Sequence, residues 1–113
     1  MHAELKLKFT DENHSPFFGP GVAQLFKLIE NTGSVRHASE AMDLSYSKAW
    51  KMIRCTEKVL GTIIVERNQG GKGGGSAKLT DSGKMLLDKF LTIEKELNAK
   101  LEELEEEYLA SYK

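Results

Sequence analysis

Cysteine, long apolar runs and net charge are all scarce in this chain, and each scarcity bears on the class of protein. Cys55 is the only cysteine among 113 residues, so no intrachain disulfide can form, which is typical of proteins in a reducing cytoplasm. No apolar run approaches the roughly 20 residues of a membrane span. The N-terminus also alternates polar and apolar residues, unlike the continuous apolar stretch of a signal peptide. We therefore expect a cytoplasmic protein without a membrane partner.

The charged residues are unevenly distributed along the chain. The formal net charge of −1 does not by itself indicate a nucleic-acid partner. Residues 34–79, however, carry eight Lys or Arg against four Asp or Glu, whereas residues 80–113 carry five against nine. The basic cluster in the middle of the chain favours DNA as a partner.

Alternating residues near the N-terminus predict a strand. Leu5, Leu7 and Phe9 lie on one face of residues 4–9 and charged side chains lie on the other. This is the pattern of a strand with one buried side. A polar link rich in turn-forming residues is expected to follow, over residues 10–21.

Capping residues delimit three short helices. Pro20 stands at the first position of a helix that Gly33 ends. Ser34 caps a second helix, and Ser45 caps a third that ends before Gly61. The second and third helices, joined by a tight link, form the arrangement of a helix-turn-helix.

A glycine tract separates two short segments that are predicted to pair as a hairpin. Five of the ten glycines fall within residues 70–75, between expected strands at 62–68 and 76–80. The tract matches neither a Walker-type loop nor a dinucleotide-binding loop, because Gly73 occupies the Ser/Thr position of the first pattern and Ser76 the last glycine of the second. The tip of a DNA-binding wing and a flexible surface loop remain as interpretations. The surrounding cations favour the wing.

The last predicted element is a long helix that Thr80 caps. Its apolar stripe has an eleven-residue period, which stays on one face of a nearly straight helix. A helix of roughly 40 Å extends beyond so small a domain, so we expect its far end to pack against a second copy in a two-fold dimer. The predicted dimerisation residues are Leu86, Phe90, Ile93, Leu97, Leu101, Leu104 and Tyr108.

Together these elements predict an α+β fold that is mainly α with a small β-hairpin. A winged helix-turn-helix DNA-binding domain is expected over residues 1–79. A long C-terminal dimerisation helix is expected over residues 80–113, and the two form a single compact unit.

The third helix and the hairpin carry the predicted DNA contacts. In a helix-turn-helix the second helix enters the major groove and its N-terminal residues reach base edges, while cations approach the phosphates. A solvated helix face is the alternative interpretation, and the side chains of Tyr46 and Trp50 could belong either to the core or to the interface. The predicted DNA-binding residues are Ser34, Ser45, Tyr46, Ser47, Lys48, Lys51, Arg54, Arg67, Lys72 and Lys78.

No catalytic arrangement can be assembled from this sequence. The three histidines are scattered without metal-ligand spacing, and no Ser/His/Asp or Cys/His set is evident. We expect no enzyme activity, no cofactor, no metal and no small-molecule effector. The competing function is a winged helix that has lost DNA binding and recruits a protein partner through its long helix.

The most distinctive parts of the chain are "FGPG" (18–21), "IENTGSVRHASEAMDLSYSKAWKMI" (29–53) and "ERNQGGKGGGSAKLTDSG" (66–83). These segments resemble the N-terminal DNA-binding domain of the ModE-type molybdate-responsive regulators, and more loosely the heads of LysR-type regulators. The patterns S-Y-x-x-A-W and G-G-K-G-G-G-x-A-x-L-T are the most specific marks of the resemblance.

The resemblance implies a dimeric winged helix that binds operator DNA as a bacterial or archaeal transcriptional regulator. Recognition contacts are then implied for residues 45–48, Lys51 and Arg54, and the wing for residues 70–78. Full-length members carry molybdate-binding domains after this region, whereas this chain ends at Lys113. We therefore expect a regulator of this type that lacks a molybdate-binding domain.

Overall fold

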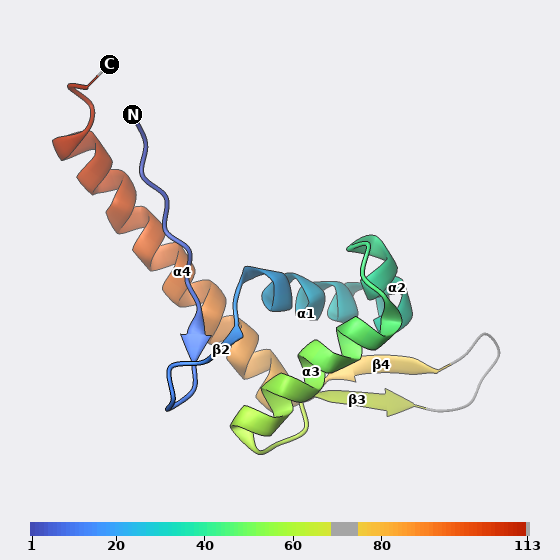
Figure 1. Cartoon of the computed structure of the whole chain (residues 1–113). Coiled ribbons are helices and arrows are strands. Elements are labelled where there is room, and N and C mark those ends of the chain that lie inside the picture. Colours follow the sequence, from blue (N-terminus) through green and yellow to red (C-terminus); the bar gives the residue numbers. More distant parts are fainter. Residues whose placement is uncertain (69–74, 113) are drawn as a thin grey trace.

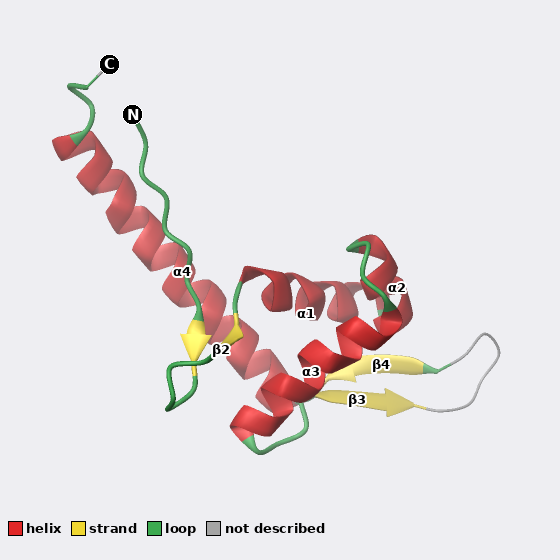
Figure 2. Ribbon diagram, viewed as in Figure 1, coloured by secondary structure: helices red, strands yellow, loops and turns green. Residues whose placement is uncertain are grey.

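The computed structural model describes residues 1–68 and 75–112. Within them the chain forms four α-helices and two two-stranded antiparallel sheets, with one long helix projecting from a helical body (Figures 1 and 2). This confirms the predicted α+β winged helix-turn-helix fold. In this part of the chain no helix combines the length and the apolar character that crossing a membrane requires. In chain order the elements are β1 (Phe9–Thr10), β2 (Pro16–Phe18), α1 (Pro20–Thr32), α2 (Val35–Ala41), α3 (Tyr46–Leu60), β3 (Val65–Asn68), β4 (Ser76–Leu79) and α4 (Asp81–Tyr108).

Helix caps and glycine stops form where the sequence predicts them. The hydroxyl oxygens of Ser34 and Ser45 each accept the backbone N–H three residues later, at 3.1 Å. Gly33 and Gly61 end α1 and α3 in the left-handed conformation, with φ of 69° and 70°, which residues with a Cβ rarely adopt. The helix boundaries therefore follow from local residues.

The N-terminal segment differs from its prediction. We expected a strand over residues 4–9, but only β1 pairs with another strand, and Leu5 is 54% exposed. Its partner β2 lies in the segment that we expected to be a turn-forming link. Because β2 is only three residues long, residues 4–8 have no described strand to pair with. They instead run alongside α4 (Figure 1).

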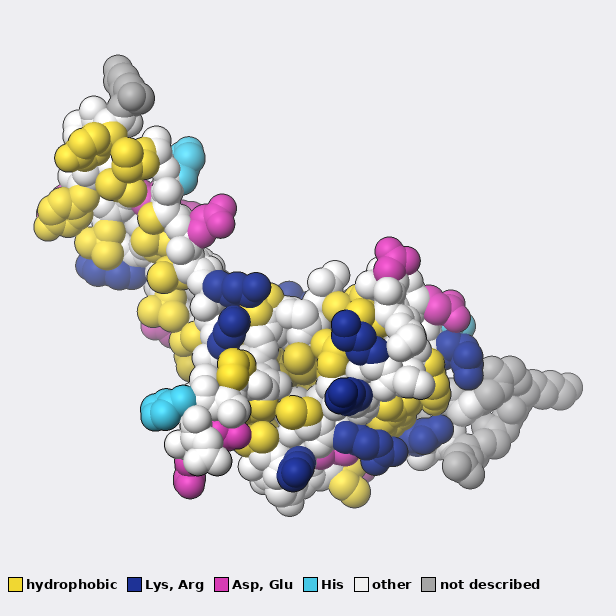
Figure 3. Space-filling model, viewed as in Figure 1, with side chains coloured by type: hydrophobic (Ala, Val, Ile, Leu, Met, Phe, Trp, Pro, Cys, Tyr) yellow, Lys and Arg dark blue, Asp and Glu magenta, His cyan; other side chains and the backbone are white. Residues whose placement is uncertain are grey.

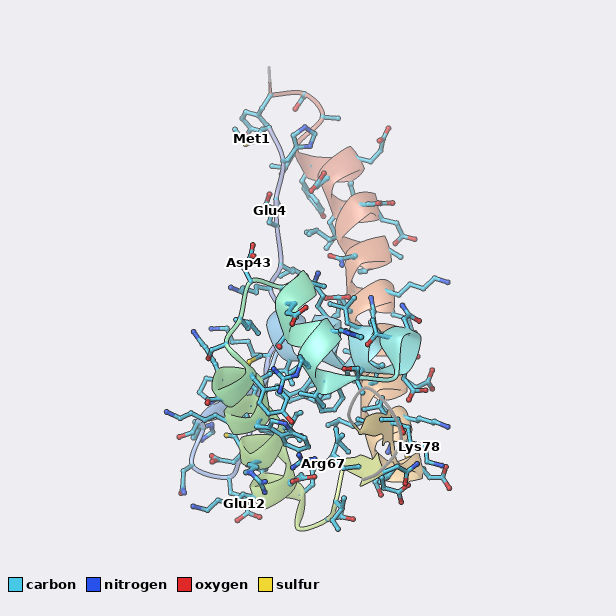
Figure 4. All side chains as sticks on the ribbon, turned by 90° about the vertical axis from the view of Figure 1, so that its right-hand side faces the viewer. Met1, Glu4, Glu12, Asp43, Arg67 and Lys78 are labelled. Carbon is cyan, nitrogen blue, oxygen red and sulfur yellow. The ribbon has the colours of Figure 1, made fainter. Side chains whose placement is uncertain are left out.

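The start of the chain is tied to the far half of α4. The backbone N–H of Ala3 donates to Oε1 of Glu105 at 2.9 Å, and this hydrogen bond lowers the pKa of the Glu105 carboxyl. Nδ1 of His2 lies 3.5 Å from Oε2 of the same residue. Figure 4 shows the segment from Met1 through Glu4 running beside the helix. Residues 4–8 are thus held between this contact and β1.

Four phenylalanines join the β1–β2 hairpin to α1 and α4. The ring of Phe18 meets the rings of Phe26 and Phe90 edge-on, with centroids 5.2 and 5.1 Å apart, and the ring of Phe9 stacks on it at 5.9 Å. Phe18, Phe26 and Phe90 are buried. Aromatic pairs of this kind add about 0.5–1.5 kcal/mol beyond their buried area, so the cluster fixes the hairpin and the first half of α4 to the helical body.

The second half of α4 extends well beyond this core. The chain measures 59 × 30 × 22 Å and has a radius of gyration of 17.0 Å, whereas a compact domain of this length has about 13 Å. Ile93, Leu97, Leu104 and Tyr108 are between 38% and 63% exposed. In the isolated chain α4 therefore presents an apolar stripe to solvent.

The start of α4 packs closely against the loop that leads into β3. Oγ1 of Thr80 accepts the N–H of Gly83 at 3.2 Å and donates to the carbonyl oxygen of Ile63 at 2.7 Å. A Cβ added to Gly83 would lie only 2.7 Å from the carbonyl oxygen of Ile64. The L-T-x-x-G pattern therefore marks the joint between the β3–β4 hairpin and α4.

Candidate nucleic-acid interface

One face of α3 is buried and the opposite face is open and basic. Ala49, Ile53 and Thr56 are fully buried. The opposite side bears a shallow hollow of about 490 Å³, and Figure 3 shows Lys and Arg side chains gathered on the face of the molecule that α3 presents. Such a surface is complementary in charge to DNA phosphates. The hollow is lined by Ser47, Trp50, Lys51, Arg54, Cys55 and Lys58.

The cationic side chains of this face are accessible to a ligand. Lys48, Lys51 and Arg54 are exposed. Among the described residues, the ion pairs that form involve none of these three side chains. Their charges are therefore not neutralised within the chain.

Two aromatic rings at the edge of this face contact three arginine side chains, which come from α2, α3 and β3. The rings of Tyr46 and Trp50 on α3 meet edge-on with centroids 6.4 Å apart. The guanidinium of Arg36 on α2 lies 4.8 Å from the centre of the Tyr46 ring, and those of Arg54 and Arg67 lie 5.3 and 4.7 Å from the centre of the Trp50 ring. Nη2 of Arg67 also donates to the Tyr46 hydroxyl at 3.4 Å. We call these five residues the arginine–aromatic cluster.

The arginine–aromatic cluster explains the two positions that the sequence left open. Tyr46 and Trp50 are half-buried, and both pack against the hydrophobic core while their rings also meet arginines. Nε1 of Trp50 is buried and has no hydrogen-bond partner among the described residues. Exposed cation–π contacts contribute about 0.5–1 kcal/mol each. The two rings therefore serve the core and also orient the arginines.

Glutamates on two helices fix the base of the β3–β4 hairpin. Oε2 of Glu57 accepts the backbone N–H of Ile64 at 2.9 Å, and Oε1 of Glu30 accepts that of Leu79 at 3.0 Å. The register pairs Arg67 with Ala77 and Glu66 with Lys78. These bonds set the direction in which the hairpin leaves the helical body.

The predicted wing residues have different surroundings. Arg67 belongs to the arginine–aromatic cluster, whereas Nζ of Lys78 lies 3.9 Å from Oε2 of Glu66 and both side chains are mostly exposed. Figure 4 labels Arg67 and Lys78 on the two neighbouring strands. Lys72 and the glycines at 70, 71, 73 and 74 lie outside the described residues.

The remaining predicted contacts lie at helix starts. Ser34 and Ser45 use their hydroxyl oxygens as N-caps of α2 and α3, and Ser47 is exposed in the first turn of α3. The predicted contacts did not include two cations on this surface, Arg36 and Lys58. Arg36 lies ten residues before Tyr46, whose ring it covers, and on another helix, so helical spacing could not have predicted this contact. Lys58 lies one turn beyond Arg54 on α3, so its place on the same face could have been predicted from helical spacing.

The predicted dimerisation residues divide into buried and exposed members. Phe90 is fully buried in the core of the chain, and Leu86 and Leu101 are half-buried. Phe90 is therefore unavailable to a second copy in this conformation, and we leave it out of the dimer surface proposed below. The exposed members of the stripe are Ile93, Leu97, Leu104 and Tyr108.

Comparisons with known proteins agree with this geometry. Residues 22–84 match the family model of the bacterial regulatory helix-turn-helix proteins of the lysR family. This range runs from the first turn of α1 to the first turn of α4 and so includes the open face of α3 and the hairpin.

Several relatives are ModE regulators, which confirms the resemblance to that type. The transcriptional regulator ModE of Yersinia pestis is 37% identical over 90 residues, which cover 80% of this chain and 34% of the relative. The DNA-binding transcriptional dual regulator ModE of Escherichia coli K12 is 36% identical over 74 residues, covering 66% and 28%. This chain thus spans about a third of the length of the curated relatives that it matches.

A solved structure supports the fold. ArgP from Mycobacterium tuberculosis superposes with a TM-score of 0.57 at 22% identity, over 79% of this chain and 31% of that one. At this identity the likeness concerns the fold alone. With a family match that covers the whole helix-turn-helix and wing, this chain belongs to the lysR family of bacterial regulatory helix-turn-helix proteins.

Proposed function

We propose that this chain binds double-stranded DNA sequence-specifically as a homodimeric regulator of transcription, and that it is not an enzyme. The observation that carries the proposal is the open face of α3, where cations without ion-pair partners among the described residues surround a shallow hollow. In a helix-turn-helix this face enters the major groove. Ser47, Lys48 and Lys51 lie at the helix start, where side chains reach base edges, and Arg54 lies one turn further along.

The hairpin and the start of α2 extend the proposed contact to the flanking phosphates. Arg67 and Lys78 supply cations from β3 and β4, and Lys72 adds one from the glycine tract. Ser34 at the start of α2 and Ser45 at the start of α3 offer hydroxyl groups. Such contacts position the protein on the duplex while base contacts from α3 specify the sequence.

The matched region covers only 34% and 28% of the two ModE relatives. We therefore extend to this chain only the DNA-binding and regulatory roles that their names state. The proposed regulator acts through equilibrium binding to DNA.

A salt series tests DNA binding directly. Each phosphate contact contributes about 0.9 to the slope of log affinity against log salt concentration. We expect fluorescence anisotropy with a labelled genomic duplex to show a slope steeper than about −5, from six or more contacts. Selection from a random duplex library should then enrich an inverted repeat. A slope near zero at low salt would refute DNA binding.

The exposed stripe of α4 is the proposed dimer surface. A two-fold dimer places the two α3 helices about 34 Å apart, in successive major grooves. We expect Leu97→Glu combined with Leu104→Glu to weaken dimerisation by at least about 100-fold, since each change removes apolar burial and adds a charge to the interface. Sedimentation velocity should then report the 12.6 kDa chain alone.

The matched control for the dimer variant changes the charge on the other side of the same helix. Lys84→Glu combined with Lys95→Glu should leave the dimer intact, because both side chains are exposed and lie off the apolar stripe. If wild-type protein sediments as a 12.6 kDa species at the concentrations that bind DNA, the dimer proposal is wrong.

The exposed apolar stripe also favours a second candidate function, a protein-interaction module. Such a module would bind a partner chain through α4 and would not need the cations of α3. Absence of salt-dependent DNA binding, together with a stable monomer in solution, would favour it.

A further inference from the structure

A groove on the side of α3 away from the β3–β4 hairpin is ringed by lysines. It has a volume of about 510 Å³ and runs between the N-terminal segment, the start of α1 and α3. Among the described residues that line it, four are lysines and none is an acid. Its floor is apolar, with Phe17, Val22 and Met52 among its side chains. The lysines are Lys6, Lys8, Lys48 and Lys51.

The chain holds Lys6 and Lys8 in place on the far side of this groove. Leu7 and Phe9 pack against the core, and side chains alternate in an extended segment, so Lys6 and Lys8 face outward together. The alkyl chain of Lys8 lies against the start of α1, since a Cβ on Gly19 would be 3.7 Å from Cγ of Lys8. Both ammonium-bearing side chains are exposed, and no ion pair of the described residues involves either.

The lysine groove is continuous with the proposed DNA-binding face. Lys51 and Cys55 line both the groove and the hollow on the open face of α3. Cations therefore follow one another from Lys6 and Lys8, across α3, to the arginine–aromatic cluster at the hairpin. A band of one charge sign across a helix is complementary to the two phosphate strands that border a major groove.

We infer that the lysine groove binds the DNA phosphate backbone on the side of α3 opposite the hairpin, with Lys6 and Lys8 as its outer contacts. The N-terminal segment thus acts as a second flanking arm of the interface. The inference rests on the proposed DNA binding. The occupant is DNA and not a small anion, because the groove is open at its border with the α3 hollow and shares Lys51 with it.

The test compares wild-type protein with Lys6→Ala/Lys8→Ala in the same anisotropy salt series. Loss of two phosphate contacts per chain, and therefore of four per dimer, should reduce the magnitude of the salt slope by about 3.6 and weaken binding at least about tenfold at about 0.15 M salt. The loss should be equal for the selected site and for random duplex, because phosphate contacts do not read sequence. Lys6→Arg/Lys8→Arg should retain binding. Lys84→Ala/Lys95→Ala, which removes the same charge from exposed positions on α4, should also retain it.

The outcomes separate this inference from the proposed function. If wild-type protein fails to bind duplex DNA, the proposed function itself fails. If wild-type protein binds and Lys51→Ala lowers the slope, but Lys6→Ala/Lys8→Ala does not, the lysine groove does not contact DNA and the inference is overturned. A change in sedimentation with an unchanged slope would assign the groove to contact between copies of this chain and would overturn it equally. Thermal melting confirms that each variant is folded.

Discussion

Lys51→Glu combined with Arg54→Glu should reduce DNA affinity by roughly 100-fold or more at about 0.15 M salt. Both side chains are exposed and line the hollow on the open face of α3. Each change removes one phosphate contact and puts a negative charge against the DNA backbone, so that attraction becomes repulsion at two positions per chain. The magnitude of the salt slope should fall by at least about 3.6, because two contacts per chain are four contacts per dimer. Anisotropy titration with the selected site measures both quantities.

The fold should survive this double change. Neither side chain is buried, and the main packing loss is the contact of Arg54 with the Trp50 ring, which contributes about 0.5–1 kcal/mol. The thermal midpoint should therefore drop by only a few degrees. Lys84→Glu combined with Lys95→Glu changes the net charge of the chain by the same amount at distant, exposed positions. If that control loses as much affinity as the α3 variant, the effect reflects total charge and α3 is not the DNA-binding helix.

Gly83→Ala should destabilise the chain by about 2–3 kcal/mol, although glycine to alanine in a helix is normally favourable. The added Cβ would lie 2.7 Å from the carbonyl oxygen of Ile64 and 3.3 Å from Cβ of Leu79. The first of these neighbours is a backbone atom and cannot rotate away. Relief of the overlap requires α4 to move off the β3 end of the hairpin, which breaks the Thr80 contacts with Ile63 and Ile64. Chemical denaturation measures the loss, which corresponds to a fall of at least about 8 °C in the thermal midpoint.

Gly21→Ala is the matched control for this substitution. Gly21 also lies in the first turn of a helix, but a Cβ there would meet nothing within 4 Å. Alanine at this position should leave stability unchanged or raise it by up to about 1 kcal/mol. Equal destabilisation by the two substitutions would show that the close packing at Gly83 is not the cause.

Much of the fold could be predicted because its signals are local. Ser34, Ser45 and Thr80 cap helices through backbone groups three residues away, and Gly33 and Gly61 end helices by their own conformation. Each cap or glycine stop acts within one helical turn, so the residues that it bonds to lie close to it in the sequence. The order of the elements, and therefore the winged helix-turn-helix fold, could be predicted from these signals.

The errors in the prediction concern features that depend on contacts between residues far apart in the sequence. The alternation at residues 4–9 correctly indicates an extended segment, but strand pairing depends on a neighbour, and β2 provides only three residues. Phe90 fits the apolar stripe of α4 by spacing, yet it is buried against Phe18 at 5.1 Å. A periodic stripe does not reveal where the body of the domain ends and the free surface begins.

The helices, their ends, the basic character of α3 and the family could be predicted from the sequence of this protein, because they depend on caps, periodicity and motifs that are read in order along the chain. Which cations share a surface depends on how the elements pack in three dimensions. Arg36, Arg54 and Arg67 converge on two rings from three elements, and Lys6 and Lys8 meet Lys48 and Lys51 across a groove. The physical reason is that charges and rings interact through distance in space, and packing of the phenylalanine core and the Thr80–Gly83 joint sets those distances.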